Sequence, residues 1–301
     1  MRRPLAALML ASVLWGGAVT GTKYALRGFS PATLLSVELL AAAGVLWAVL
    51  LVRGYRPTRS WWLPVLLGLL EPALAYLADT FGLSLTSAVN GAVISGLESA
   101  LVVVLAAMLL GEAVTGPAVW AVLIALGGLV VLAGAGEGHG TVAGDLLVAG
   151  GMLSASLYTV VAKRFGDGSD VLSLTAWQFA VAAAASVPLT LLRWSAGPEV
   201  PPAHVAARYW LVALLVGIGG YGLSFLLFNQ VIGSVDAGWA AVVLNLIPVF
   251  AFVSAVACLG EDVTRSEAIG ALLIGSSVLY FTMADRRGAR ESPAATAEPA
   301  S

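Results

Sequence analysis

Apolar runs of about 20 residues recur along the whole chain, separated by short joints rich in polar residues, Gly and Pro. A helix needs about 20 predominantly apolar residues to cross a hydrocarbon core of about 30 Å. Joints such as residues 53–59 and 165–170 contain Gly, Pro and charged residues, which end helices. The pattern therefore predicts ten membrane-spanning helices, at residues 5–22, 31–52, 62–82, 88–110, 117–136, 142–162, 171–192, 209–231, 237–259 and 267–284.

The composition supports an all-helical membrane protein. Of 301 residues, 59% are hydrophobic and 11% are charged, whereas a soluble domain has about 45–50% and about 25%. The mean hydropathy of +0.95 also excludes a soluble globule. A net charge of −2 argues against a nucleic-acid partner. One Cys and two His are too few for a disulfide framework or a His/Cys metal site, so we expect neither metal nor cofactor.

The distribution of Lys and Arg predicts the orientation. Ten of the 15 basic residues fall on the side of the N-terminus and five on the other side, which favours cytoplasmic termini in the plasma membrane. The N-terminal residues also resemble a secretory signal peptide, but nine further spans follow, and we expect the first helix to be retained. Residues 285–301, rich in Ala, Pro, Ser, Glu and Arg, are predicted to form a disordered cytoplasmic tail.

An internal repeat divides the spans into two sets of five. Residues 109–115 align with residues 258–264 at an offset of 149, pairing Gly111 with Gly260, Glu112 with Glu261, Val114 with Val263, and Thr115 with Thr264. The pattern predicts two five-helix units, residues 1–136 and 137–284. An odd number of crossings in each unit gives the two units opposite orientations, as in many secondary transporters. The alternative is a chance match between two similar turns in a chain of low complexity.

Short motifs follow one another in order along the chain, at residues 14–16, 23–31, 86–88 and 110–112 of the first unit, and at residues 144–146, 157–158, 175–178, 228–229, 245–250 and 259–261 of the second. In these motifs, and over nearly all ten spans, the chain resembles the EamA-type members of the drug/metabolite transporter superfamily. The resemblance implies a ten-helix carrier, expected to be an exporter, that moves small metabolites, amino acids or drugs by alternating access. The sequence departs from the pattern at Glu38, where many relatives resemble Arg-Phe, and at Glu98-Ser99, which lacks the proline present at Pro248.

Four acidic residues lie within the predicted spans of the first unit. Glu71 and Glu98 are each about 14 to 15 Å along their helices, near the midplane, while Glu38 and Asp79 lie nearer the outer surface. A charge at the bilayer centre costs from about 2.5 to more than 10 kcal/mol, so such residues usually face a wet cavity. We predict that Glu71 and Glu98 bind protons or a substrate amine, with Glu38 and Asp79 along the outward path. The alternatives are permanently protonated carboxyls that hydrogen-bond to a neighbouring helix, or, for Glu71, a Glu71-Pro72 pair that marks a local break in the third helix.

Aromatic and amide residues within the spans form a second group of candidates for the cavity. A polar side chain inside a span needs a hydrogen-bond partner, which is either a ligand or another helix. The group consists of Trp15, Tyr76, Tyr158, Trp177, Gln178, Tyr221, Asn229, Trp239 and Asn245. Pro248 removes a backbone hydrogen bond and is the candidate hinge.

Three further charged residues have candidate structural roles near the ends of the spans. Lys23 either attracts an anionic substrate or extends to the lipid headgroups. Glu112 and Glu261 are expected to cap the helix that follows each of them.

The predicted function is therefore a secondary transporter whose partners are the bilayer, a small-molecule substrate and, as the candidate coupling ion, the proton. The Gly-rich stretches at residues 126–128 and 217–220 are not phosphate-binding loops, and both histidines lie in predicted loops, so we expect neither ATP-driven transport nor an enzyme. The alternatives are an uncoupled exchanger or uniporter, or a channel-like protein. The sequence is compatible with a monomer or a homodimer.

Overall fold

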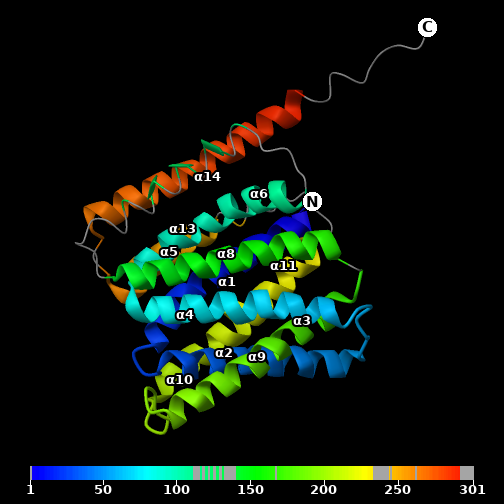
Figure 1. The fold of residues 1–301 in the computed structure, drawn as a ribbon, viewed down its shortest axis with the longest axis vertical. Helices are drawn as coiled ribbons and strands as arrows, with labels where there is room; N and C mark the ends of the chain where they lie inside the picture. Colours follow the sequence, from blue (N-terminus) through cyan, green and yellow to red (C-terminus); the bar gives the residue numbers. More distant parts are fainter. Residues whose placement is uncertain are drawn as a thin grey trace.

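The computed structural model describes residues 2–110, 140–166, 168–232, 246–261 and 263–291, together with residue 244 and isolated positions between 116 and 131. Within these residues the regular secondary structure is helical throughout (Figure 1). The predicted span at residues 117–136 lies almost entirely outside this part of the chain, as does the first half of the predicted span at residues 237–259.

In the part of the chain that the structure describes, seven helical segments are long and apolar enough to cross a membrane. They are formed by α1 (Arg2–Ala25), α2 (Pro31–Arg53), α3 (Trp62–Gly68) with η1 (Leu69–Leu74) and α4 (Ala75–Leu85), α5 (Ala88–Ser95) with α6 (Leu97–Leu110), α8 (Val142–Phe165), α9 (Val171–Ser195), and α10 (Ala207–Leu215) with η2 (Val216–Leu223) and α11 (Ser224–Ile232). Each coincides with a predicted span. The structure therefore confirms a multi-pass helical membrane protein.

Two shorter apolar segments follow. The first consists of α13 (Leu246–Ser254) and η3 (Ala255–Leu259), and the second lies within α14 (Arg265–Glu291). Helix α14 continues seven residues beyond residue 284, where we predicted the last span to end and the tail to begin. Ala, Arg and Glu in this segment are good helix formers, which explains the later boundary.

Three of the helices contain π-helical segments, at η1, η2 and η3. In η1, Glu71 has a non-helical backbone conformation (φ −150°, ψ 125°). Its neighbour Pro72 lacks an N–H and disfavours the helical conformation in the residue before it. The repeat offset of 149 carries η1 onto residues 218–223, within η2. The third and eighth predicted spans are therefore irregular at corresponding positions.

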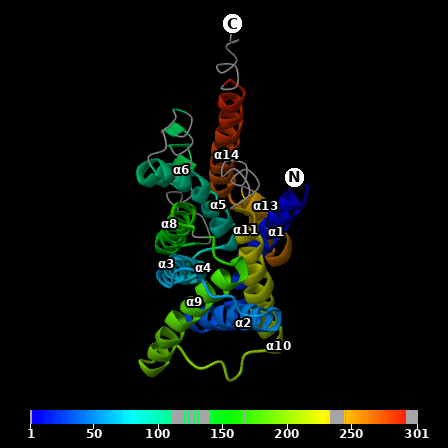
Figure 2. The ribbon, with the colours of Figure 1, turned by 90° about the vertical axis from the view of Figure 1, so that its right-hand side faces the viewer.

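The helices pack around a shared apolar core. Helix α2 packs against α9, α4 against α8, and α1 against both α11 and α13 (Figures 1 and 2). Fully buried residues such as Leu39, Phe179 and Phe225 occupy the centre of the core. Helix α14 lies at one edge of the bundle in Figure 1. The large apolar side chains that remain exposed, such as Leu51 and Leu272, are consistent with a lipid-facing surface.

Two glycines allow close contact between helices in the two halves of the chain. A Cβ atom at Gly68 of α3 would lie 2.7 Å from the carbonyl oxygen of Gln178 in α9, and one at Gly217 of η2 would overlap the carbonyl oxygen of Glu38 in α2. Small residues at such contacts let helix backbones approach closely within a membrane. The two contacts pair the third span with the seventh and the eighth with the second.

Charged side chains bind the free backbone groups at several helix ends. Glu261 accepts hydrogen bonds from the backbone N–H groups of Ala88 and Val89. It therefore caps α5, and our expectation that it caps the following helix is wrong. The reason is that η3, which precedes Glu261, packs against the N-terminal turn of α5. The corresponding prediction for Glu112 lies outside the described residues.

Lys23 binds the opposite kind of helix end. Its Nζ atom donates hydrogen bonds to the backbone carbonyl oxygens of Leu83 and Thr86, at the C-terminus of α4. A cation is favourable there because the last carbonyls of a helix carry partial negative charge. Neither role that we considered for Lys23, substrate attraction or extension to the headgroups, describes this position.

Candidate functional site

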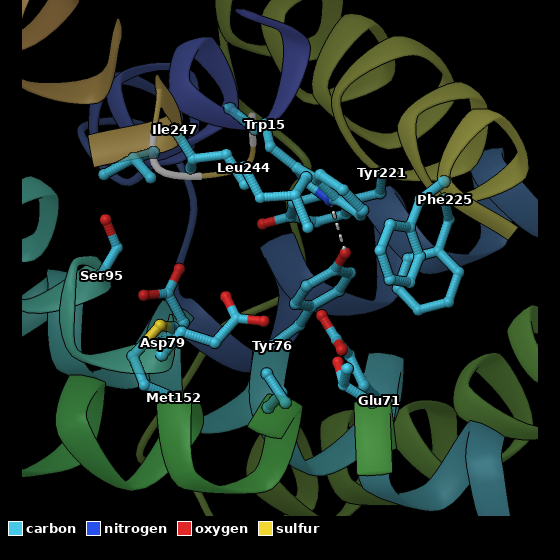
Figure 3. Close-up of a pocket in the computed structure, with 17 residues that line it drawn as sticks. Trp15, Glu71, Tyr76, Asp79, Ser95, Met152, Tyr221, Phe225, Leu244 and Ile247 are labelled. Atoms are coloured by element: carbon cyan, nitrogen blue, oxygen red, sulfur yellow. Dashed lines mark hydrogen bonds between the residues drawn. The ribbon is translucent and has the colours of Figure 1, made fainter. Parts of the chain in front are cut away.

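A cavity with a volume of about 80 Å³ lies between the helices, beside the break in the third span (Figure 3). One water molecule occupies about 10–15 Å³ on a comparable scale, so the cavity accommodates a few waters or a small chemical group. Residues from α1, η1, α4, α5, α6, α8, η2, α11 and α13 contribute to its wall, so both halves of the chain form it.

Three of the four acidic residues that we singled out line this cavity: Glu71, Asp79 and Glu98. In Figure 3, Glu71 and Asp79 lie on either side of Tyr76. Glu71 and Glu98 are close enough to interact electrostatically. Among the residues that the structure describes, no Lys or Arg lines the cavity. The cavity is thus an acidic site whose protein partners, as far as the chain is described, supply no neutralising charge.

Breaks in two helices place the two midplane acids. Glu71 occupies the non-helical position before Pro72, and Glu98 lies in the first turn of α6, directly after the break that separates α6 from α5 at Gly96. The Pro72 break can be read from the sequence, because Pro disrupts helices. The break at Gly96 was not predicted, since the fourth span lacks a proline and Gly is common in membrane helices.

Aromatic rings form another part of the cavity wall. The Nε1–H group of Trp15 donates a hydrogen bond to the Tyr76 hydroxyl, at 3.1 Å, and the Tyr76 ring stacks on the Tyr221 ring with 4.1 Å between centroids. Phe225 and Phe228 make edge contacts with Trp15, with centroids 5.8 and 5.7 Å apart. Aromatic faces attract organic cations, so the rings and the carboxyls favour the same class of ligand.

The fourth acid, Glu38, does not line the cavity. Its side chain is completely buried in α2, where its Oε1 atom accepts a hydrogen bond from the Thr22 hydroxyl at 3.1 Å. The Thr22 hydroxyl is also 3.1 Å from the hydroxyl of Tyr221, which does line the cavity. Glu38 therefore lies behind the cavity wall rather than along an open path.

Three of the predicted polar residues form a separate hydrogen-bonded cluster. Tyr158 donates a hydrogen bond to the Asn229 side-chain oxygen at 2.9 Å, and Asn229 in turn donates to Thr175 and Gln178 at 3.1 and 3.4 Å. None of these four residues lines the cavity. The cluster matches the alternative that we considered for amides within spans, namely hydrogen bonding to another helix.

The remaining candidates lie elsewhere. Trp177 is 37% exposed and donates a hydrogen bond to Tyr55, so it does not face the cavity. Trp239 and Asn245 fall outside the described residues. Pro248 lies in α13, one residue after Ile247 of the cavity wall, and its role as a hinge stays a prediction.

Several cavity and helix-end residues escaped the sequence analysis. The apolar residues of the wall include Met152, Phe225 and Phe228. Residues of these types occur throughout membrane helices, so the sequence does not show which of them line a cavity. Asp145, in the first turn of α8, is buried and accepts hydrogen bonds from Thr86 and Asn90, at 2.5 and 3.2 Å. A carboxylate in the first turn of a predicted helix was the available signal for this contact.

Within the described residues, no group of three or more His, Cys, Asp or Glu side chains is arranged to hold a metal ion.

Comparison with known proteins identifies similar transporters. The model of the EamA-like transporter family matches residues 3–134 and 142–283, one match in each half. An uncharacterized transporter of Archaeoglobus fulgidus is 29% identical over 287 residues, which cover 92% of this chain and 96% of the relative. The uncharacterized transporter YyaM of Bacillus subtilis is 27% identical over 281 residues, which cover 89% and 90%. A solved crystal structure aligns with a TM-score of 0.70 over 94% of this chain and 97% of its own, at 22% identity, a likeness of fold alone.

Proposed function

Because this chain belongs to the EamA-like transporter family, we propose that it is a secondary transporter that binds small organic cations in the cavity between Glu71, Asp79 and Glu98. The observation that carries this proposal is the set of three cavity carboxyls that no described Lys or Arg neutralises. Partly buried carboxylates gain most from a partner of opposite charge. Protonated amines meet this requirement, and the rings of Trp15, Tyr76 and Tyr221 add cation–π attraction.

Alternating access is proposed to operate through two inverted five-helix repeats, ten spans in all. Two packing contacts support this arrangement, because each contact joins the spans that correspond, in the opposite half, to the spans joined by the other contact. The third span packs on the sixth through α4 and α8, and the eighth packs on the first through α11 and α1. The contact of Gly68 with Gln178 and the contact of Gly217 with Glu38 are related in the same way, since the third and seventh spans correspond to the eighth and second. In this scheme both termini are in the cytoplasm, and the membrane is the plasma membrane.

Protons are the proposed coupling ion, and export is the proposed direction. A cavity carboxyl that releases a proton when the cation enters would exchange one charge for another across the membrane. Efflux driven by the proton gradient then follows if the cation leaves towards the side from which protons arrive. An uncoupled exchanger or uniporter is the second candidate, since the same carboxylates can bind a cation without exchanging protons.

The test uses purified protein in liposomes that contain a pH dye. Amino acids, polyamines and cationic drugs are added in turn, and proton flux is recorded for the wild type, Glu71→Gln, Glu98→Gln and the double variant. We expect cations alone to trigger proton flux, and the double variant to abolish it. Saturable cation exchange without proton movement would favour the uncoupled exchanger, and transport confined to neutral or anionic compounds would contradict the proposed cation site.

Asp170→Asn serves as the matched control for removing a carboxyl. Asp170 caps α9 by accepting hydrogen bonds from the backbone N–H and the hydroxyl of Ser173, outside the cavity. Asn is an equally good N-cap residue, so this variant is expected to keep wild-type flux. Loss of flux in the control as well would show that removing any carboxyl harms the protein nonspecifically.

A further inference from the structure

Glu38 is the one of the four span acids that the cavity does not use, although it is the most deeply buried. Its side chain has no exposed surface. Its Oε1 atom accepts a hydrogen bond from Thr22, whereas its Oε2 atom has no hydrogen-bond partner in the described part of the chain. A buried carboxylate oxygen without a partner is costly, but a protonated carboxyl in the same place requires one acceptor, which Thr22 can supply.

Two hydroxyl groups connect Glu38 to the cavity. Thr22 lies between Glu38 and Tyr221, at 3.1 Å from each. Tyr221 lines the cavity and stacks on Tyr76. The titratable groups that face Glu38 from the elements packed on α2 are Tyr221 of η2 and Asp79 of α4, both in the cavity wall. Glu38 is therefore connected to the cavity wall through two hydroxyl groups.

We propose that Glu38 is a proton-binding site separate from the cavity, and that Thr22 and Tyr221 transmit its protonation state to the bound cation. This inference rests on the proposed function, since it assumes that the cavity binds a cation. It assigns to Glu38 the proton that is exchanged and leaves Glu71, Glu98 and Asp79 to contact the substrate.

The direction of the hydroxyl chain depends on the state of Glu38. When Glu38 is ionised, the Thr22 hydroxyl donates a hydrogen bond to Glu38 and accepts one from the Tyr221 hydroxyl. The lone pairs of the Tyr221 oxygen then face the cavity. When a proton from solvent binds Glu38, the carboxyl donates to Thr22, and Thr22 donates to Tyr221. The Tyr221 proton then turns towards the cavity. Only the O–H bond on Glu38 is made or broken, because the two hydroxyls merely rotate.

This reversal opposes simultaneous binding of a proton and a cation. An ammonium group is a hydrogen-bond donor, so it is favoured by an acceptor in the cavity wall and disfavoured by a second donor. Ionised Glu38 therefore promotes cation binding through Tyr221, and protonated Glu38 weakens it. Mutual exclusion of the two ligands is the requirement for proton–cation exchange, because each ligand must reduce the affinity of the other.

The other half of the chain contains a neutral counterpart of Glu38. Glu38 contacts Gly217 of η2 through its backbone, and Gln178 of α9 makes the corresponding contact with Gly68 of α3. Gln178 is completely buried and hydrogen-bonded to Tyr158. An amide is thus accommodated at the equivalent helix contact, so Glu38→Gln is a variant that is expected to fold and to lack only the titratable proton.

The experiment measures binding of methylamine, a small protonated amine with N–H donors, to purified protein by isothermal titration calorimetry across a range of pH. Release of one proton for each cation bound changes the affinity about tenfold per pH unit. We expect the affinity of Glu38→Gln for methylamine to change with pH less steeply than that of the wild type, by about a factor of ten per pH unit. Thr22→Val should show the same reduction, because the hydroxyl connection is lost, whereas Thr22→Ser should keep the wild-type dependence. A wild-type pH dependence in Glu38→Gln would overturn the proposal.

Infrared spectroscopy of the protein without ligand provides a second, independent measurement. Acidification of the wild type should produce the carbonyl band of a protonated carboxyl that is missing from Glu38→Gln and retained in Thr22→Val. If the wild type and Glu38→Gln give the same carbonyl bands, Glu38 binds no proton and the proposal is wrong. If methylamine binds neither the wild type nor Glu38→Gln while the Glu38 band titrates, the cation site of the proposed function fails, but the proton site is supported.

Discussion

At the scale of single residues, carboxyls that bind helix ends differ in their surroundings from carboxyls that face the cavity. Glu199 and Glu261 accept hydrogen bonds from backbone N–H groups of α2 and α5, whereas Glu71 and Glu98 face the cavity. The sequence distinguishes these kinds by depth, because a carboxyl in the middle of an apolar run has no helix end nearby. It could not reveal that Glu38 lies behind Tyr221, since that arrangement depends on the packing of three helices.

Glu199 gives a prediction about stability and pH. Burial by itself raises the pKa of this carboxyl, but hydrogen bonds from Ser30, Ala32, Arg193 and Thr33 outweigh burial and hold the pKa below its ordinary value. The stabilisation is therefore present above the ordinary pKa of Glu and is lost as the pH falls through the lower pKa of the folded protein. Glu199→Gln should lower stability by about 0.5–2 kcal/mol at neutral pH and by less in acid. Thermal unfolding in detergent at both pH values measures the difference, and an equal loss at both would contradict the assignment.

Trp15 gives a prediction about affinity. Trp15→Phe removes the N–H group that binds Tyr76 while keeping an aromatic ring in the cavity wall. A hydrogen bond of this kind contributes about 0.5–1.5 kcal/mol, so the KM for a transported cation should rise about two- to tenfold. Trp177→Phe is the control, because it also removes a hydrogen bond, to Tyr55, outside the cavity. Equal effects of the two substitutions on KM would argue against a special role of Trp15.

At the scale of elements, the hydrophobic pattern predicted where the helices lie but not how they are interrupted. All seven long helical segments coincide with predicted spans, and most ends differ by no more than three residues. The pattern succeeds because the length of an apolar run is fixed by the thickness of the bilayer. The π-helical segments and the break at Gly96 depend on contacts with other helices, which hydropathy does not record.

Pro72 gives a prediction at this scale. Pro72→Ala restores a backbone N–H beside Glu71 and removes the restriction on its conformation. The third span should then become more regular and carry Glu71 away from the cavity, with a loss of transport and no loss of folded protein. The measurement is cation uptake per mole of purified, monodisperse protein. Pro188→Ala is the control, since Pro188 lies within the uninterrupted helix α9, and it should retain transport.

At the scale of the whole molecule, the two halves share a pattern of contacts but differ in chemistry. The cavity carboxyls and Glu38 lie in the first half, and Gln178 occupies the helix contact in the second half that Glu38 occupies in the first. The repeat offset predicted which spans correspond. The offset did not predict which spans are in contact, because an alignment of the two halves carries no information about packing between them.

The paired glycine contacts give a prediction for the assembled bundle. Gly217→Ala and Gly68→Ala each place a Cβ against the backbone of the other half, and overpacking of this kind costs about 1–3 kcal/mol. Both variants should therefore lower the midpoint of thermal unfolding. Gly219→Ala is the matched control in the same segment, because its Cβ would meet no atom within 4 Å. A loss of stability as large in the control would show that helix contact is not the cause.

The unneutralised carboxyls of the cavity also determine how the carrier responds to voltage. An elementary charge that crosses the whole membrane gains or loses about 2.3 kcal/mol per 100 mV. Glu71, Asp79 and Glu98 lie within the bundle, and no described Lys or Arg lines the cavity beside them. In the proposed exchange the carrier holds either one proton or one monovalent cation, so its two loaded forms carry the same net charge. The exchange of one ligand for the other therefore moves no net charge across the membrane and should not respond to an imposed potential, whereas an uncoupled uniporter of cations should be driven by the potential as well as by the concentration gradient.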